Sequence, residues 1–114
     1  MASYGIGRGL AGSILALPLG LASAAAIETD LPPERQKVLM HVLTQECGSC
    51  HGLSMRGGLG SPLRPENLEG RPDSAFQAII LHGIGGTPMP AWRPILSEAD
   101  AAWMVKVLRA GVIE

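Results

Sequence analysis

Cys47 and Cys50 are the only cysteines in the chain, and His51 directly follows the second. A Cys-x-x-Cys-His segment is typical of covalent haem attachment, in which each thiol forms a thioether with a porphyrin vinyl group and the histidine binds the iron as its proximal ligand. A gap of two residues suits one helical turn, which points both sulfur atoms at the same edge of the ring. The sequence therefore predicts one covalently attached haem c, held by these three residues.

Three other uses of these residues fit less well. A structural zinc site needs about four ligands, and no second Cys/His cluster lies at a suitable spacing. A thioredoxin-like dithiol needs a βαβ context, which the hydrophobic pattern does not show. A structural disulfide would leave the position of His51 unexplained. Haem attachment accounts for all three side chains together.

A haem iron that serves electron transfer usually has a sixth ligand, and the candidates downstream are Met55, His82, Met89 and Met104. We predict Met89, because its rigid Pro-Met-Pro loop can reach the distal face, whereas Met55 is too close to the motif and Met104 lies on a predicted core face. His82, at a helix end, remains the alternative and would give a bis-histidine haem of lower potential. With Met89 bound the iron has no open position, so the expected function is electron transfer and not catalysis.

The haem propionates need hydrogen-bond donors, and Trp92 and Arg93 follow the predicted distal ligand closely. An indole N–H and a guanidinium fork both suit a carboxylate. The alternative is that Trp92 only packs and Arg93 is solvated. Three other arginines remain possible partners: Arg56, Arg64 and Arg71.

Apolar residues recur at helical spacing in three segments that must position these groups. The first starts near Pro33 and runs to Gln45, directly into the haem motif. The second covers residues 73–82, with Asp73 placed to cap its first turn and Gly83 to end it. A glycine-rich stretch between these two helices suits backbone lying close against a flat ligand.

The third helix is predicted to start at Ser97, with Asp100 completing a capping box, and to end before Gly111. Its expected core face contains Ala101, Met104, Val105 and Leu108. Residues 65–68 add at most one helical turn, and no strand-like alternation appears. The predicted fold class is all-α, with three to four short helices around one haem.

Residues 1–26 have the layout of a secretory signal peptide. Arg8 is the only charge before Glu28, the run 10–21 is almost wholly apolar, and small residues follow it. That run is shorter than the roughly 20 residues of a membrane-spanning helix. An uncleaved signal that tethers the protein to the membrane remains the alternative.

We expect cleavage after Ala24 or Ala26, which leaves a single-haem domain of about residues 27–114. Bacterial c-type haem is attached outside the cytoplasm, so the predicted location is the periplasm. Loss of Arg8 from nine basic residues leaves eight against ten acidic ones, which predicts no nucleic-acid partner. A chain of this size buries only about 60% of its unfolded surface, so a covalent haem would complete its core. We expect a monomer.

With these motifs in place, the chain resembles class I c-type cytochromes. It is most similar to the NirC-type single-haem cytochromes encoded beside the haem-cd nitrite reductase of denitrifying bacteria. The shared stretches are residues 50–52, 56–60, 65–70, 86–92 and 96–99.

The resemblance implies His51 as proximal ligand, Met89 as distal ligand, and redox protein partners. It implies that the protein passes electrons to nitrite reductase or assists formation of that enzyme's special haem. A second hypothesis is catalytic or accessory, with Met89 displaced so that the iron binds peroxide or a small gas.

Two features depart from the family pattern. Relatives usually have proline directly after Gly60, where a carbonyl accepts the proximal histidine's Nδ1 hydrogen; here Ser61 intervenes. The carbonyl that orients the histidine is therefore left open. Many relatives also have an aromatic residue at the position of Val107, and Trp103 either replaces its packing or faces solvent.

Overall fold

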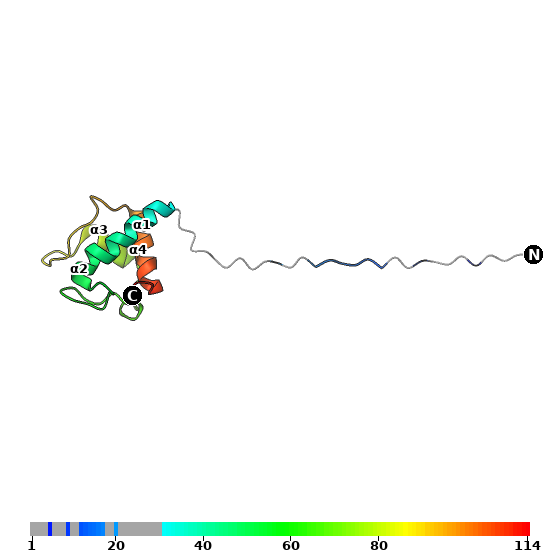
Figure 1. Ribbon diagram of the computed structural model, residues 1–114, viewed down its shortest axis with the longest axis horizontal. Coiled ribbons are helices and arrows are strands. Elements are labelled where there is room, and N and C mark those ends of the chain that lie inside the picture. Colours follow the sequence, from blue (N-terminus) through cyan, green and yellow to red (C-terminus); the bar gives the residue numbers. More distant parts are fainter. Residues whose placement is uncertain (1–4, 6–8, 10–11, 18–19, 21–30) are drawn as a thin grey trace, which may run out of the picture.

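The computed structural model describes residues 31–114 and, before them, residues 5, 9, 12–17 and 20 (Figure 1). The predicted cleavage sites after Ala24 and Ala26 lie outside the described residues, as does most of the predicted signal peptide, which stays a prediction. Within the described part, no helix is long and apolar enough to cross a membrane.

The described chain is helical and contains no strand, which confirms the predicted all-α class. Its helical segments are α1 (Pro33–His41), the π-helical η1 (Val42–Cys47), α2 (Gly48–His51), the 3-10 turn η2 (Pro65–Asn67), α3 (Asp73–His82) and α4 (Glu98–Ala110). Long loops join α2 to α3 and α3 to α4. These two loops contain most of the residues predicted to surround the haem.

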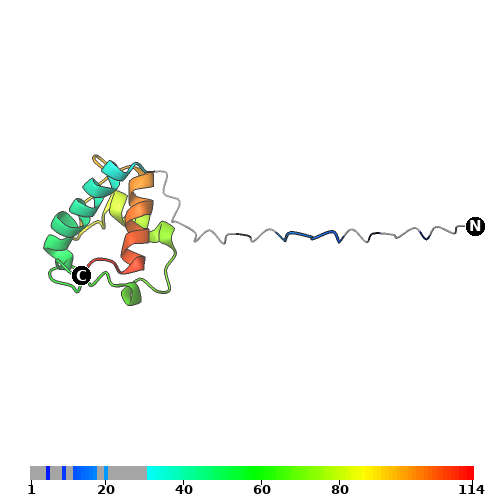
Figure 2. The ribbon, with the colours of Figure 1, turned by 45° about the vertical axis from the view of Figure 1, so that its right-hand side comes forward.

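The segments α1, η1 and α2 form one continuous helical rod, because the residues at both junctions keep right-handed helical angles. The sequence placed the end of this helix near Gln45, whereas the rod continues to His51 and ends where Gly52 takes a φ of 89°. The Cys-x-x-Cys-His motif is therefore the last turn of the rod. In Figure 2 the rod and α4 lie close together at the N-terminal end of each.

Helix α4 begins and ends as predicted. The Ser97 side chain accepts a hydrogen bond from the Asp100 N–H, the Asp100 carboxylate accepts one from the Ser97 N–H, and Gly111 ends the helix at a φ of 67°. The predicted cap of α3 is wrong. Pro72 precedes that helix without any side-chain cap, and Asp73 instead accepts a hydrogen bond from Arg109. The Asp73 carboxylate binds the Arg109 guanidinium, which is far away in the sequence and comes close only in the folded chain.

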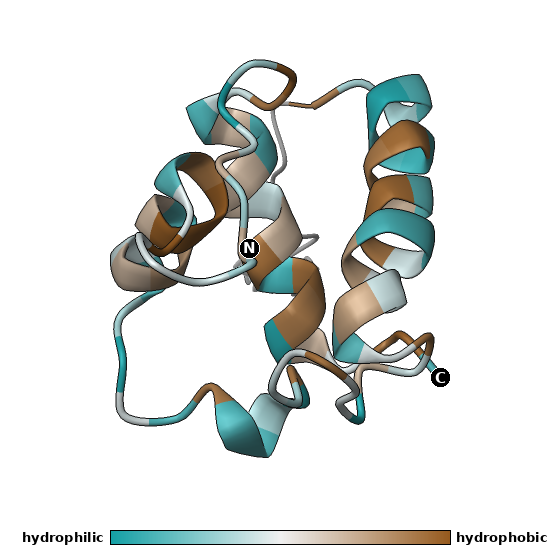
Figure 3. Cartoon of the chain, turned by 90° about the vertical axis from the view of Figure 1, so that its left-hand side faces the viewer, coloured by the Kyte–Doolittle hydropathy of each residue, from teal (hydrophilic) through white to brown (hydrophobic). Residues whose placement is uncertain are grey.

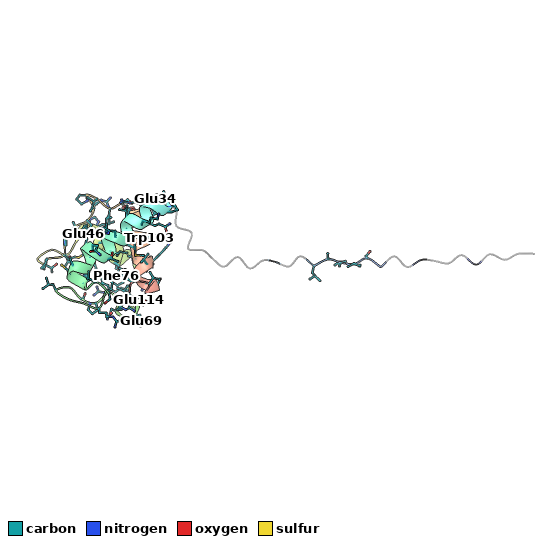
Figure 4. The ribbon with its side chains drawn as sticks, in the orientation of Figure 1. Glu34, Glu46, Glu69, Phe76, Trp103 and Glu114 are labelled. Atoms are coloured by element: carbon teal, nitrogen blue, oxygen red, sulfur yellow. The ribbon has the colours of Figure 1, made fainter. Side chains whose placement is uncertain are left out.

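The core forms where α4 packs on α3 and on the rod. The predicted face of α4 is confirmed, since all four of its residues are buried. Leu39 and Leu43 of the rod, with Ile80 and Leu81 of α3, belong to the same cluster, and Figure 3 shows brown apolar residues along the helices. Trp103, labelled in Figure 4, is only 8% exposed, so it packs in the interior and does not face solvent.

Two arginines clamp the helices together. Arg35 of α1 donates to both carboxylate oxygens of Asp100, at 3.0 and 2.6 Å, and to the Ile95 carbonyl at 3.2 Å. The Arg35 guanidinium holds the pKa of the Asp100 carboxyl below its usual range. Arg109 of α4 donates to the carboxylate of Asp73 and lies over the Phe76 ring at 5.4 Å. Both clamps connect α4 to an earlier helix.

Candidate haem-binding site

The two cysteines lie on the last turns of the rod, and no disulfide joins them. Cys47 is half-buried against the core, and Cys50 is exposed. Burial, with a smaller contribution from the charge of Glu46, raises the pKa of the Cys47 thiol to about 11. Thiol–disulfide exchange requires a thiolate, so this environment disfavours a thioredoxin-like role. Among the described residues, no three His, Cys, Asp or Glu side chains gather as they would around zinc.

The imidazole of His51 is oriented by the backbone of the glycine-rich loop. Its Nδ1 lies 2.6 Å from the Ser61 carbonyl oxygen. A carbonyl can only accept, so Nδ1 carries a proton, and in the neutral imidazole Nε2 is then the nitrogen with the free lone pair. No described residue hydrogen-bonds to Nε2. The carbonyl left open by the sequence is therefore that of Ser61, the residue that precedes proline here.

The glycine-rich loop satisfies the carbonyls at the end of the rod. The N–H of Gly57 donates to the His51 carbonyl at 2.7 Å, and the N–H of Gly60 donates to the Cys50 carbonyl at 2.8 Å. A Cβ at Gly60 would lie 2.7 Å from two atoms of the His51 ring. The flat group that this loop approaches in the structure is thus the imidazole. Contact of the loop with the haem itself stays a prediction.

The loop that carries Met89 is closed by a hydrogen bond between two of its own residues and is tied to α3 by a second one. The N–H of Ile84 donates to the Met89 carbonyl at 3.2 Å, and the N–H of Trp92 donates to the Ile80 carbonyl at 3.0 Å. A Cβ at Gly83 would lie 2.6 Å from the Met89 carbonyl oxygen, so only glycine allows this close return. Met89 itself is half-buried. The loop therefore holds the backbone of the predicted distal ligand in place.

The competing ligands differ in their surroundings. Met55 and Met104 are 1% and 0% exposed and form part of the core. His82 is exposed at the end of α3, and His41 is exposed in α1. The assignment of the distal position to Met89, with His82 as the alternative, stays a prediction.

Trp92 and Arg93 take different positions. Trp92 is half-buried against the core, and no described residue hydrogen-bonds to its indole. The Arg93 guanidinium lies 3.6 Å from the Glu98 carboxylate and its side chain is 54% exposed. Arg56 and Arg64 together line a surface hollow of about 370 Å³, and Arg64 also donates to the Ile113 carbonyl at 2.7 Å. Propionate contacts of these residues stay predictions.

Known proteins resemble the chain over most of its length. Residues 34–106 match the family model described as cytochrome C oxidase, cbb3-type, subunit III. Cytochrome c55X of Stutzerimonas stutzeri is 48% identical over 99 residues, which cover 87% of this chain and 82% of that protein. Cytochrome c55X of Paracoccus denitrificans is 46% identical over 94 residues, covering 82% and 91%. The chain belongs to the c-type cytochromes.

A solved structure supports the same family. The c-type cytochrome NirC superposes on this cytochrome with a TM-score of 0.71 at 48% identity, and the match covers 73% of this chain and 98% of that one. The predicted resemblance to the NirC-type group is confirmed. Membership of the family brings covalently bound haem c with it, so the predicted cofactor is confirmed as well.

The residues of this cytochrome fit that cofactor. Two free thiols and an imidazole with an available Nε2 lie on one helical turn, which is the donor set that haem c requires. Sequence reasoning missed Ser61 as the acceptor for His51 and Gly60 as the residue that admits the ring. The only indication in the sequence that Ser61 could be this acceptor was its position between Gly60 and Pro62, where relatives usually have no such residue. The sequence predicted that Gly60 lies in a loop, but it did not predict that the loop packs against the His51 ring.

Proposed function

We propose that this cytochrome carries single electrons in the periplasm, with haem c bound through Cys47 and Cys50 and the iron held by His51 and Met89. The observation that carries the proposal is the 2.6 Å hydrogen bond between His51 Nδ1 and the Ser61 carbonyl. In this bond the Nδ1 proton is donated to a backbone carbonyl, so Nε2 is the nitrogen that can bind a metal next to the two thiols. Such a carbonyl also fixes the plane of the ring.

The cysteines attach the cofactor without any redox step of their own. Each thiol would hold the haem by addition across one vinyl group, with an S–C bond in place of the vinyl π bond and the thiol proton on the neighbouring vinyl carbon. When bound, the iron supplies one-electron chemistry by alternating between ferrous and ferric states. Because Cys50 is exposed, a haem edge attached there would be accessible to a partner protein. That edge is the proposed point of electron exchange.

Met89 closes the sixth coordination position in this proposal. A thioether ligand favours ferrous iron and raises the reduction potential relative to imidazole. The hydrogen bonds at Ile84 and Trp92 support this role, since the first closes the loop at Met89 and the second holds the loop against α3. With both axial positions filled, the protein exchanges electrons without binding a substrate and is not an enzyme.

We propose dissimilatory nitrite reductase as the electron acceptor. The support is the similarity to NirC-type cytochromes, together with the 48% identity to the solved c-type cytochrome NirC. Periplasmic location is supported by the leader-like pattern of residues 1–26. It is also supported by the covalent haem, because bacterial haem attachment takes place outside the cytoplasm.

The proposal is tested with the holoprotein purified from a strain competent in haem attachment. Reduced cytochrome mixed rapidly with nitrite reductase should be oxidised with second-order kinetics, and cell fractionation should find the protein in the periplasm. The ferric spectrum should show a methionine-to-iron charge-transfer band that survives excess cyanide. Rapid loss of that band in cyanide or nitric oxide would favour the catalytic or accessory hypothesis. No oxidation by nitrite reductase would remove that enzyme as acceptor.

A further inference from the structure

A π-helical turn interrupts the rod immediately before the haem motif. Segment η1 lies between two α-helical stretches, and His41 and Gly48 on either side keep right-handed helical angles. At its C-terminal end the N–H of Gly48 donates to the Leu43 carbonyl, five residues back, as in a π-helix. A turn of this kind accommodates a surplus residue while the helix on both sides continues.

The surplus residue determines which side chains lie on the side of the rod that faces the core. Leu39, Leu43, Cys47 and His51 are spaced by four; the two leucines are 0% and 1% exposed, and Cys47 packs against the same core. In an uninterrupted α-helix such residues drift by about 40° per step, so His51 would lie about 120° from Leu39. One surplus residue removes about 100° of that drift. His51 thereby returns to the stripe of the two leucines.

Thr44 adds side-chain hydrogen bonds where the backbone pattern changes. Its hydroxyl donates to the Met40 carbonyl at 3.0 Å and lies 3.2 Å from the His41 carbonyl. A threonine bonded to the preceding turn competes with the backbone ladder and favours a departure from the regular α-helix. Thr44 is therefore placed to stabilise the π turn.

We propose that this π turn, with Thr44 as its positioning residue, sets the rotation of the haem motif about the rod axis and so aims His51 at the interior. The inference rests on the proposed attachment of haem through Cys47 and Cys50. To that proposal the inference adds the π turn as the feature that determines which way the Cys-x-x-Cys-His motif faces.

A matched deletion and insertion test the inference. Deletion of Gln45, which is exposed, removes the surplus residue and leaves a straight α-helix with His51 on the same stripe. Insertion of one alanine after Gln45 adds a second surplus residue and turns the motif by about 100°. We expect the deletion variant to keep the wild-type yield of covalently bound haem and the wild-type ferric spectrum. The insertion variant should lose most of its haem.

This asymmetry separates the π turn from two other arrangements. If the segment were an ordinary α-helix, deletion and insertion would rotate the motif by equal amounts in opposite senses, and both variants would lose haem. If it were a flexible joint, both variants would keep haem. Either symmetric outcome overturns the inference. A wild-type protein without thioether-bound haem would instead overturn the proposed function.

A substitution tests the positioning residue without changing the length of the chain. In the full-length holoprotein, Thr44→Val should shift the reduction potential and lower the midpoint of chemical unfolding, because the hydroxyl bonds are lost. Thr44→Ser keeps the hydroxyl and should restore both values. In the chain without Gln45, Thr44→Val should leave the potential unchanged, since the π turn is gone. An equal shift in both chains, or none in the full-length chain, would contradict the role of Thr44.

Discussion

The proposed proximal and distal sides of the site are held by different kinds of contact. On the proximal side, the glycine-rich loop bonds to the carbonyls of Cys50 and His51 and to the His51 ring itself. On the distal side, the loop that carries Met89 is tied through its backbone, and no described residue hydrogen-bonds to the methionine sulfur. The fold therefore orients the proximal side chain directly, whereas it holds only the backbone around the distal one.

Loss of the proximal motif should have the largest effect. We expect Cys47→Ala, Cys50→Ala and His51→Ala each to leave little folded holoprotein, because a domain of this size is marginal without the haem in its core. The measurement is the yield of haem protein from a strain competent in attachment, with His82→Ala as the control that keeps its haem. Wild-type amounts of haem-free mutant with normal helical circular dichroism would contradict the organising role of the haem.

A pair of glycine substitutions compares the two loops. Gly60→Ala places a Cβ 2.7 Å from the His51 ring, whereas a Cβ at Gly85, in the distal loop, meets nothing within 4 Å. We expect Gly60→Ala to lower the free energy of unfolding by about 1–3 kcal/mol and to disturb the ferric spectrum. Gly85→Ala should do neither. Chemical unfolding of the two holoproteins measures this, and equal effects would remove the distinction between the loops.

Replacement of Met89, the proposed distal ligand, should change the potential but leave the protein folded. In Met89→His the iron stays six-coordinate, and we expect its potential to fall because imidazole lacks the thioether's preference for ferrous iron. The shift should be a substantial part of the roughly 0.8 V that axial ligands span. His82→Ala is the control and should alter the potential much less. A redox titration that found the reverse order would transfer the distal role to His82.

The clamp between Arg35 and Asp100 anchors the end of the distal loop through Ile95. Asp100→Asn should lower the free energy of unfolding by about 1–2 kcal/mol, since a charge-assisted bond is lost and the partly exposed arginine is screened by solvent. The pKa of Asp100 is lowered in the folded state. Its stabilisation is thus complete above the ordinary carboxyl pKa, near about 4, and is lost as the pH falls through the folded value.

Unfolding measured from neutral to acid pH checks this prediction. The wild type should lose stability relative to Asp100→Asn below about pH 4, and the two curves should run parallel above it. Asp100→Leu serves as a second variant that removes the hydrogen bonds altogether. Curves that stay parallel down to acid pH would show that this carboxylate contributes no pH-dependent stability.

The smallest expected effect is at Trp92, three residues after the proposed distal ligand. Trp92→Phe preserves an aromatic packing residue but removes the indole N–H, and a propionate that loses its donor shifts its pKa toward the neutral form. The reduction potential of the variant should then vary more steeply with pH across the neutral range. Identical potential profiles in the two proteins would leave Trp92 as a packing residue.

Features that depend on local rules could be predicted from the sequence. The capping box at Ser97 and Asp100 and the left-handed Gly111 bound α4 as expected, because caps bond to backbone groups only a few residues away. Gly83 ends α3 for the same reason. The spacing of the two cysteines and the histidine indicated covalent haem before any contact was known, since that chemistry lies within one helical turn.

The tertiary structure decided the contacts between distant segments. Ser61 orients His51, Gly60 admits its ring, and Asp73 leaves its expected cap for Arg109. Each of these contacts joins residues that are 9 to 36 positions apart in the chain. The periodicity of apolar residues does not predict which distant residues meet. The hydrophobic pattern also could not predict the π turn. Residues spaced by four have the same sequence pattern whether or not a surplus residue brings them back onto one side of the helix. The sequence by itself thus determined the chemistry and the helices, and packing determined the direction in which the proximal ligand points.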